Sequence, residues 1–172
     1  MSQSSQLTLA FEYRPAYDDD HFVVAPCNEV AVSWIDRWPD WPSPYLIIHG
    51  PAGCGKTHLS EVFRRRADAK VLTHRALAKN CPRDPEGAGG GWIVEDADSY
   101  LFDGEPEPLF HFLNQVLEGQ GQLLLSARAA PSQWRADLAD LRSRINAAPA
   151  VAIGPPDDEL LAAVLVKHFT DR

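Results

Sequence analysis

One eight-residue segment constrains the fold more than any other part of the chain. Residues 50–57 read Gly-Pro-Ala-Gly-Cys-Gly-Lys-Thr and match the phosphate-binding pattern G-x-x-x-x-G-K-[ST]. They follow the apolar run Tyr45-Leu46-Ile47-Ile48-His49, which is typical of a strand buried on both faces. An amphipathic helix is expected over about residues 56–66. Strand, glycine-rich loop and helix together are the context that this motif requires, so the segment predicts a nucleotide-binding site.

Each residue type in this loop has a physical task. Glycines let the backbone curl so that several N–H groups point at a phosphate, helped by the N-terminus of the next helix. Lys56 supplies a positive charge for the β- and γ-phosphates, and the Thr57 hydroxyl can bind Mg²⁺. The residues predicted to hold the nucleotide here are Gly50, Ala52, Gly53, Cys54, Gly55, Lys56 and Thr57.

The rest of the chain alternates between strand-like and helix-like patterns. Further strands are expected at residues 70–73, 92–94, 122–126 and 150–153. Helices are expected at residues 28–38 and over about residues 157–170. Another is expected to begin near residues 106–108 and end at residue 118, and residues 132–145 are expected to be mixed helix and loop. This alternation predicts an α/β fold with a five-stranded parallel sheet covered by helices on both faces.

Polar residues at the ends of two predicted strands complete the candidate site. Glu95 and Asp96 follow the strand 92–94, where carboxylates can bind the metal and orient the attacking water. Asp98 is a third candidate, and Ser126 ends the next strand, where its hydroxyl could touch the γ-phosphate or the water. A solvent-exposed acid pair is the plainer alternative for Glu95 and Asp96.

Two arginines, Arg142 and Arg144, lie between the last two predicted strands. An arginine here could reach the nucleotide of a neighbouring molecule and stabilise charge in the transition state. A solvated helix face explains the same pattern equally well, and the residue types alone do not decide between the two.

Charge and composition exclude several classes of protein. The formal net charge is −8, with 24 acidic and 16 basic residues, whereas proteins that live on duplex DNA usually carry a basic face. The one basic run, residues 64–66, fits the last turn of a helix. We therefore expect weak or no direct DNA binding, with any role on DNA exerted through protein partners. Three cysteines without C-x-x-C spacing indicate neither a zinc site nor a disulfide framework.

No apolar run reaches the ~20 residues that span a bilayer. The first residues, Met-Ser-Gln-Ser-Ser-Gln, lack the regions of a signal peptide. The sequence therefore predicts a cytoplasmic protein without a membrane partner.

The order of several short segments resembles the DnaA family of AAA+ replication initiators. These segments are Gly50–Thr57 with His58-Leu59, Ile93-Val94-Glu95-Asp96, Leu117-Glu118-Gly119, Leu123-Leu124-Leu125-Ser126, Leu141-Arg142-Ser143-Arg144 and Ile153-Gly154-Pro155-Pro156. The resemblance implies an AAA+ three-layer sandwich and covers nearly everything from Tyr17 onward. It also implies that Phe22, Val23, Val24 and His58 border the adenine nucleotide, ADP or ATP.

Two further features are similar to one branch of this family, the DnaA-related regulators called Hda. Residues 6–11, Gln-Leu-Thr-Leu-Ala-Phe, resemble peptides that dock on the DNA polymerase sliding clamp (its β subunit), with Gln6, Leu7, Leu9 and Phe11 as the contacts. Such a peptide places apolar side chains in a groove while glutamine sets the register. There is no room for an initiator's DNA-binding domain. The expected organisation is an arm at 1–16, a nucleotide-binding base at 17–154, and the first helix of an incomplete lid at 155–172.

The resemblance implies a regulatory mechanism. A protein of this kind docks on the clamp and promotes hydrolysis of ATP bound to DnaA, which prevents re-initiation, with Arg144 as an arginine finger in trans. Mg²⁺ would involve Thr57, Glu95 and Asp96. Glu95 stands where initiators usually have aspartate, and Arg128 where an acid is common. These two departures predict weak or no intrinsic ATPase activity. The resemblance also implies a location at the nucleoid or replisome. Whether the chain associates with itself stays open.

Two other functions remain as alternatives. A small P-loop kinase would suit the length, but it needs an acceptor site, and phosphoryl transfer to nucleosides or small alcohols would reveal it. A helicase-loader-like ATPase would contact single-stranded DNA, which the acidic balance and the lack of basic and aromatic stripes disfavour.

Overall fold

The computed structural model describes residues 22–73, 76–77, 91–102 and 106–170. The strands are β1 (Tyr45–His49), β2 (Lys70–Leu72), β3 (Trp92–Val94), β4 (Leu123–Ala127) and β5 (Ala150–Ala152). The helices are α1 (Glu29–Asp36), α2 (Lys56–Arg66), α4 (Ser99–Phe102), α5 (Glu107–Glu118), α6 (Ala139–Ala147) and α7 (Asp158–Thr170), with a 3₁₀ turn at Pro131–Gln133. Each predicted strand is present to within a residue or two at its ends, whereas α4 was not predicted.

The five strands form one parallel sheet in the order β2-β3-β4-β1-β5. The predicted five-stranded parallel sheet is therefore confirmed. β4 is inserted between β1 and β3, and its residues Ser126 and Ala127 pair with Ile48 and His49 at the end of β1. The carboxyl ends of β1, β4 and β3 consequently meet along one edge of the sheet, where parallel sheets bind ligands.

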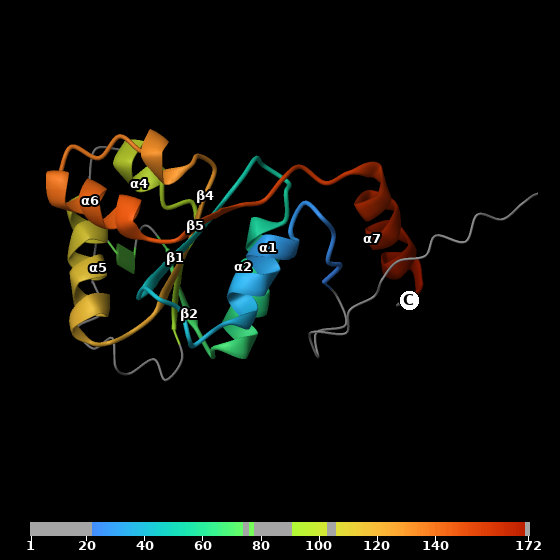
Figure 1. Cartoon of the computed structure of the whole chain (residues 1–172), viewed down its shortest axis with the longest axis horizontal. Coiled ribbons are helices and arrows are strands. Elements are labelled where there is room, and N and C mark those ends of the chain that lie inside the picture. The colour runs from blue at the N-terminus through green and yellow to red at the C-terminus, as the bar shows by residue number, and fades with distance from the viewer. Residues whose placement is uncertain (1–21, 74–75, 78–90, 103–105, 171–172) are drawn as a thin grey trace, which may run out of the picture.

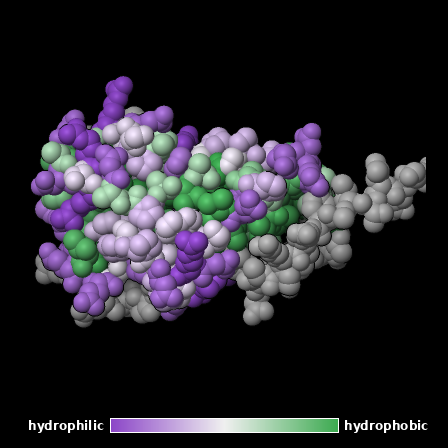
Figure 2. Space-filling view, viewed as in Figure 1, coloured by the Kyte–Doolittle hydropathy of each residue, from purple (hydrophilic) through white to green (hydrophobic). Residues whose placement is uncertain are grey.

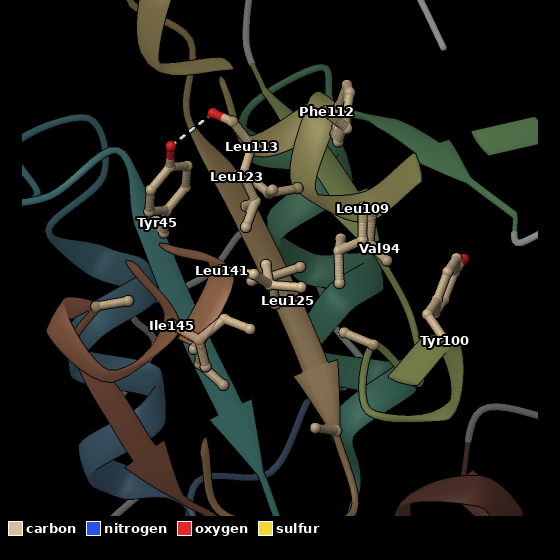
Figure 3. Packing of buried hydrophobic residues seen from close by; sticks show 14 of the residues in the cluster. Tyr45, Val94, Tyr100, Leu109, Phe112, Leu113, Leu123, Leu125, Leu141 and Ile145 are labelled. Atoms are coloured by element: carbon tan, nitrogen blue, oxygen red, sulfur yellow. Dashed lines mark hydrogen bonds between the residues drawn. The ribbon is translucent and has the colours of Figure 1, made fainter. Parts of the chain in front are cut away.

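Alternating residues of β1 are buried on opposite faces of the sheet, which makes the molecule a three-layer sandwich. Tyr45 and Ile47 belong to a core shared with α5 and α6, whereas Leu46 and Ile48 belong to a core shared with α1 and α2. Figure 1 shows these two helical layers on either side of the sheet, and Figure 3 shows the packing beneath α5 and α6. Burial on both faces explains why the run from residue 45 to 48 is wholly apolar.

The last helix, α7, lies away from the main body (Figure 1). Leu160 is buried, but Leu161, Val164, Leu165 and Val166 each expose about half of their surface or more, at 47–65%. Figure 2 shows apolar surface on the viewed face between the main body and this helix. Across the described ranges, no helix is both long enough and apolar enough to cross a membrane.

Candidate functional site

Three glycines give the loop between β1 and α2 its shape. Gly53 and Gly55 have φ values of +78° and +97°, in the left-handed region that side chains disfavour. Gly50 is required for a different reason, because a Cβ there would collide with the carbonyl oxygen of Ile153 and lie 2.9 Å from the Cys54 Sγ. The loop is thus wedged against the end of β5 and can curl only with glycine at these positions.

Substituting Gly50 with alanine is expected to lower the free energy of unfolding by about 2–3 kcal/mol, since overpacking against a fixed backbone carbonyl leaves little room to relax. Urea unfolding of the two proteins measures the loss. Gly121→Ala is the matched control, because a Cβ there meets only ordinary contacts at 3.6 Å or more. Equal stability of Gly50→Ala and Gly121→Ala would contradict the close approach of β5 to the loop.

Lys56 directs its ammonium group into this loop. The side chain is buried, and Nζ donates hydrogen bonds to the carbonyl oxygens of Gly50 (2.8 Å) and Pro51 (2.9 Å). The Cys54 Sγ lies 3.8 Å from the same nitrogen. Because Gly55 is the N-cap of α2, the ammonium and the positive end of that helix converge on one concavity, which favours an anion.

Ser126 and Asp96 are brought together at the ends of β4 and β3. The Asp96 N–H donates to the Ser126 hydroxyl oxygen (3.3 Å), and the Ala97 N–H donates to the Ser126 carbonyl (2.7 Å). Asp96 has a φ of +47°, an uncommon backbone conformation that tends to occur at functional sites. Ser126 is only 2% exposed, so it lies beneath the surface between β1 and the acidic pair.

Asp98 has a structural role that its position in the sequence did not reveal. Its buried carboxylate accepts hydrogen bonds from the backbone N–H groups of Arg128 (3.0 Å) and Ala129 (3.1 Å). It therefore fixes the segment that follows β4. Asp96 remains largely exposed, with the Arg128 Nε 3.9 Å from its Oδ1 in a pair too solvated to be strong.

The segment before α1 lies against the first turn of α2. The rings of Phe22 and His58 meet edge to face at 5.1 Å between centroids. Buried Asn28 holds the backbone in place, because its Nδ2 donates to the Val23 carbonyl (3.0 Å) and its Oδ1 accepts from the Ala25 N–H (2.9 Å). Phe22, Val23 and Val24 are partly buried in this segment.

Burial at this edge of the sheet disfavours charge on two titratable groups. The pKa of Tyr100 is raised to about 12, first by burial and then by the negative charge of Asp96. The pKa of His49, which immediately precedes the loop, is lowered by burial. Both side chains are therefore neutral at pH 7, and Lys56 supplies the positive charge inside the loop.

The donor atoms at the site fit Mg²⁺. Thr57 is exposed in the first turn of α2, Glu95 is half-buried, and the oxygen ligands of these residues and Asp96 are the type that Mg²⁺ prefers. Because β4 separates β1 from β3, the acids lie two strand spacings, or about 10 Å, from the end of β1. No group of three or more His, Cys, Asp or Glu that could hold a metal occurs within the described residues. A shared site with phosphate oxygens and water fits this arrangement.

No protein-family model matches the chain. Among solved structures, it is similar to domain III of the Thermotoga maritima replication initiation protein DnaA, with a TM-score of 0.74 and 20% identity over 92% of this chain and 75% of that one. A DNA replication initiation factor matches with a TM-score of 0.72 and 16% identity, over 88% of this chain and 53% of that one. AMPPCP-bound DnaA from Aquifex aeolicus matches with a TM-score of 0.70 and 18% identity, over 92% of this chain and 56% of that one.

The chain has the fold of the AAA+ domain of DnaA. At these identities the similarity establishes the fold alone. The chain spans little more than half the length of two of these three proteins.

Within this AAA+ fold, Arg144 lies far from the phosphate-binding loop. It is in the last turn of α6, its guanidinium carbon is 5.8 Å from the centre of the Phe110 ring, and its charge lies close enough to the Tyr45 hydroxyl to lower the pKa of that group. Tyr45 begins β1, whereas the loop follows the end of β1, about 16 Å away at the ~3.3 Å rise of each strand residue. Arg142, two residues earlier on α6, is exposed.

The structure thus brings together most of the predicted nucleotide site and separates Arg144 from it. The predicted clamp contacts, Gln6, Leu7, Leu9 and Phe11, lie outside the described residues. Two features were not predicted from the sequence. They are the hydrogen bonds that Asp98 accepts from the backbone after β4, and the closeness of Tyr45 to Arg144. Neither carries a local signal, since their partners are 30 and 99 positions away along the chain.

Proposed function

We propose that this chain is an adenine-nucleotide-binding AAA+ regulator that promotes hydrolysis of ATP on a partner AAA+ initiator of the DnaA type. The loop at residues 50–57 grips ADP or ATP, and Arg144 acts on the nucleotide of the partner. The protein is then an activator in trans with weak or no ATPase activity of its own. Docking on the DNA polymerase sliding clamp places it where it limits re-initiation of replication.

The observation that supports this proposal most is the position of Arg144. At the opposite end of β1, its guanidinium is out of reach of a phosphate held by the chain's own Lys56. A phosphate that Arg144 touches must therefore belong to another molecule. An arginine finger supplied in trans stabilises the charge that develops on the transferring phosphoryl group.

The chain's own nucleotide then serves as a structural ligand. Lys56 and the backbone N–H groups of the loop hold its phosphates, Phe22 and His58 flank it on the side of α1, and Thr57 with Glu95 or Asp96 holds Mg²⁺. Mg²⁺ supplies charge neutralisation at the phosphates when bound. Arg128 beside Asp96 weakens the negative field at that carboxylate, which favours a slow intrinsic ATPase.

Clamp docking is tested on the N-terminal arm. Replacing Leu9 and Phe11 together with alanine is expected to weaken binding to the clamp by roughly 100-fold, because buried apolar anchors carry most of the energy in such peptides. Surface plasmon resonance with immobilised clamp measures the affinity. The control replaces Ser4 and Ser5 with alanine and should bind like the wild type, whereas equal affinity of the Leu9/Phe11 variant would reject the docking peptide.

The function as a whole is tested by adding the purified chain, with clamp, to ATP-loaded DnaA and following release of phosphate. The proposal predicts faster hydrolysis than by DnaA alone. Hydrolysis that stays unchanged, together with phosphoryl transfer to a nucleoside or small alcohol, would support the kinase instead.

A further inference from the structure

We infer that Tyr45 and Phe110 are positioning residues that hold the Arg144 guanidinium ready for a partner's phosphate. This inference rests on the proposed function, which assigns Arg144 its role in trans. It concerns two aromatic residues that neither touch the nucleotide loop nor belong to any motif in the sequence. The contacts come from three elements, the start of β1, the first turn of α5 and the last turn of α6.

Tyr45 offers Arg144 an oriented acceptor. The phenol is buried, at 6% exposed, and its hydroxyl donates a hydrogen bond to the Leu113 carbonyl at 2.6 Å (Figure 3). Because that bond uses the only proton of the hydroxyl, the oxygen lone pairs are left to accept from the guanidinium. Burial raises the pKa of Tyr45, and Arg144 opposes this rise, as expected for a cation close to the phenol oxygen.

Phe110 restrains the same guanidinium from a second side. Its ring centre is 5.8 Å from the Arg144 Cζ, within the range of a cation–π contact, and the ring itself packs against the core. Arg144 also lies in the last turn of α6, where the helix dipole favours a cation. Three independent attractions therefore converge on one side chain that is only half-buried.

The remaining N–H groups of the guanidinium stay available. Arginine has five N–H donors in a planar fork, of which a single phenol oxygen can occupy few. A guanidinium that these contacts already restrain, and that is still partly exposed, loses less rotamer freedom when it meets a phosphate. The arrangement suits a group that must be in place before the transition state forms.

Conservative substitutions test this inference. Tyr45→Phe keeps the buried ring and removes only the hydroxyl, and Phe110→Leu keeps an apolar side chain and removes the ring face. Each is expected to lower the maximal stimulated rate of ATP hydrolysis on DnaA by roughly 10-fold to 100-fold, the scale seen when a reacting group is misplaced. The concentration of the chain at half-maximal stimulation should stay unchanged, because binding surfaces are intact. Phe110→Trp, which restores an aromatic face, should recover most of the rate.

Two comparisons separate positioning from a general structural role. In an Arg144→Ala background, Tyr45→Phe and Phe110→Leu should cause no further loss, since their effect acts through Arg144. Leu117→Ala, at an exposed position on the same helix as Phe110, is the control and should stimulate like the wild type.

The outcomes distinguish this inference from the function beneath it. If Arg144→Ala itself leaves stimulation intact, the proposed function fails and the inference fails with it. If Arg144→Ala abolishes stimulation while Tyr45→Phe and Phe110→Leu retain full rates, the function stands and the positioning role is rejected. If the Tyr45→Phe protein does not fold, the comparison of Phe110→Leu with Phe110→Trp decides alone whether an aromatic ring positions Arg144.

Discussion

Replacing Arg144 with alanine is expected to lower the stimulated rate of ATP hydrolysis on DnaA by roughly 1,000-fold or more, the contribution of an arginine finger supplied in trans. The physical reason is the loss of a guanidinium that offsets negative charge on the transferring phosphoryl group. Since Arg144 lies by Tyr45 at the start of β1, and the loop follows the other end of that strand about 16 Å away at the ~3.3 Å rise of each residue, nucleotide binding by the chain itself should be unchanged. Stimulation is measured by phosphate release, and binding by titration with a fluorescent ADP analogue.

The matched control for Arg144→Ala is Arg142→Ala. Arg142 is an exposed arginine on the same helix, two residues before Arg144, so the substitution makes an equal change in net charge. It should leave stimulation within about twofold of the wild type, which is the scale of exposed substitutions. An Arg142→Ala variant as inactive as Arg144→Ala would show that the net charge of α6, and not one positioned guanidinium, carries the effect.

Replacing Lys56 with alanine is expected to weaken the binding of ADP and ATP by roughly 100-fold or more, a loss of about 2.7 kcal/mol. The buried ammonium lies where the loop and the positive end of α2 converge, so its charge acts on phosphate with little screening by water. Isothermal titration calorimetry at fixed ionic strength measures the loss for each nucleotide.

Lys70→Ala is the control for Lys56→Ala, since it removes the same charge from an exposed position on β2. It should bind nucleotide like the wild type. The Lys56 side chain also donates to the Gly50 and Pro51 carbonyls, so thermal unfolding without nucleotide reveals whether the loop itself has loosened. A Lys56→Ala protein that stays folded and binds ADP within threefold of the wild type would contradict the assignment of the phosphate site.

Local patterns were sufficient to predict most of the fold. The run from residue 45 to 49 is wholly apolar up to His49 because β1 is buried on both faces, and its predicted bounds agree with the structure. The predicted bounds of α2 also agree, because Leu59, Val62 and Phe63 repeat on one side of it. The short helix α4 was missed, since its four residues are too few to show a helical period.

Sheet order and long-range contacts could not be predicted in the same way. No residue of β4 signals that this strand lies between β1 and β3, yet that placement puts Ser126 beside Asp96. Asp98 was a third carboxylate candidate after Glu95 and Asp96, whereas in the structure its Oδ2 accepts hydrogen bonds from two backbone N–H groups in the segment after β4. The closeness of Arg144 to Tyr45 likewise depends on tertiary packing, since Tyr45 shares a core with Leu141 and Ile145 of α6.

One measurement tests the central claim most directly, namely that this chain acts on a nucleotide that another molecule holds. DnaA is loaded with radiolabelled ATP and the purified chain with unlabelled ADP, and conversion of the labelled ATP to ADP is followed in a single turnover in the presence of clamp. The account predicts that the chain accelerates this conversion in proportion to its occupancy on DnaA, while its own ADP is retained. Conversion at the rate of DnaA alone, at every concentration of the chain, would contradict it.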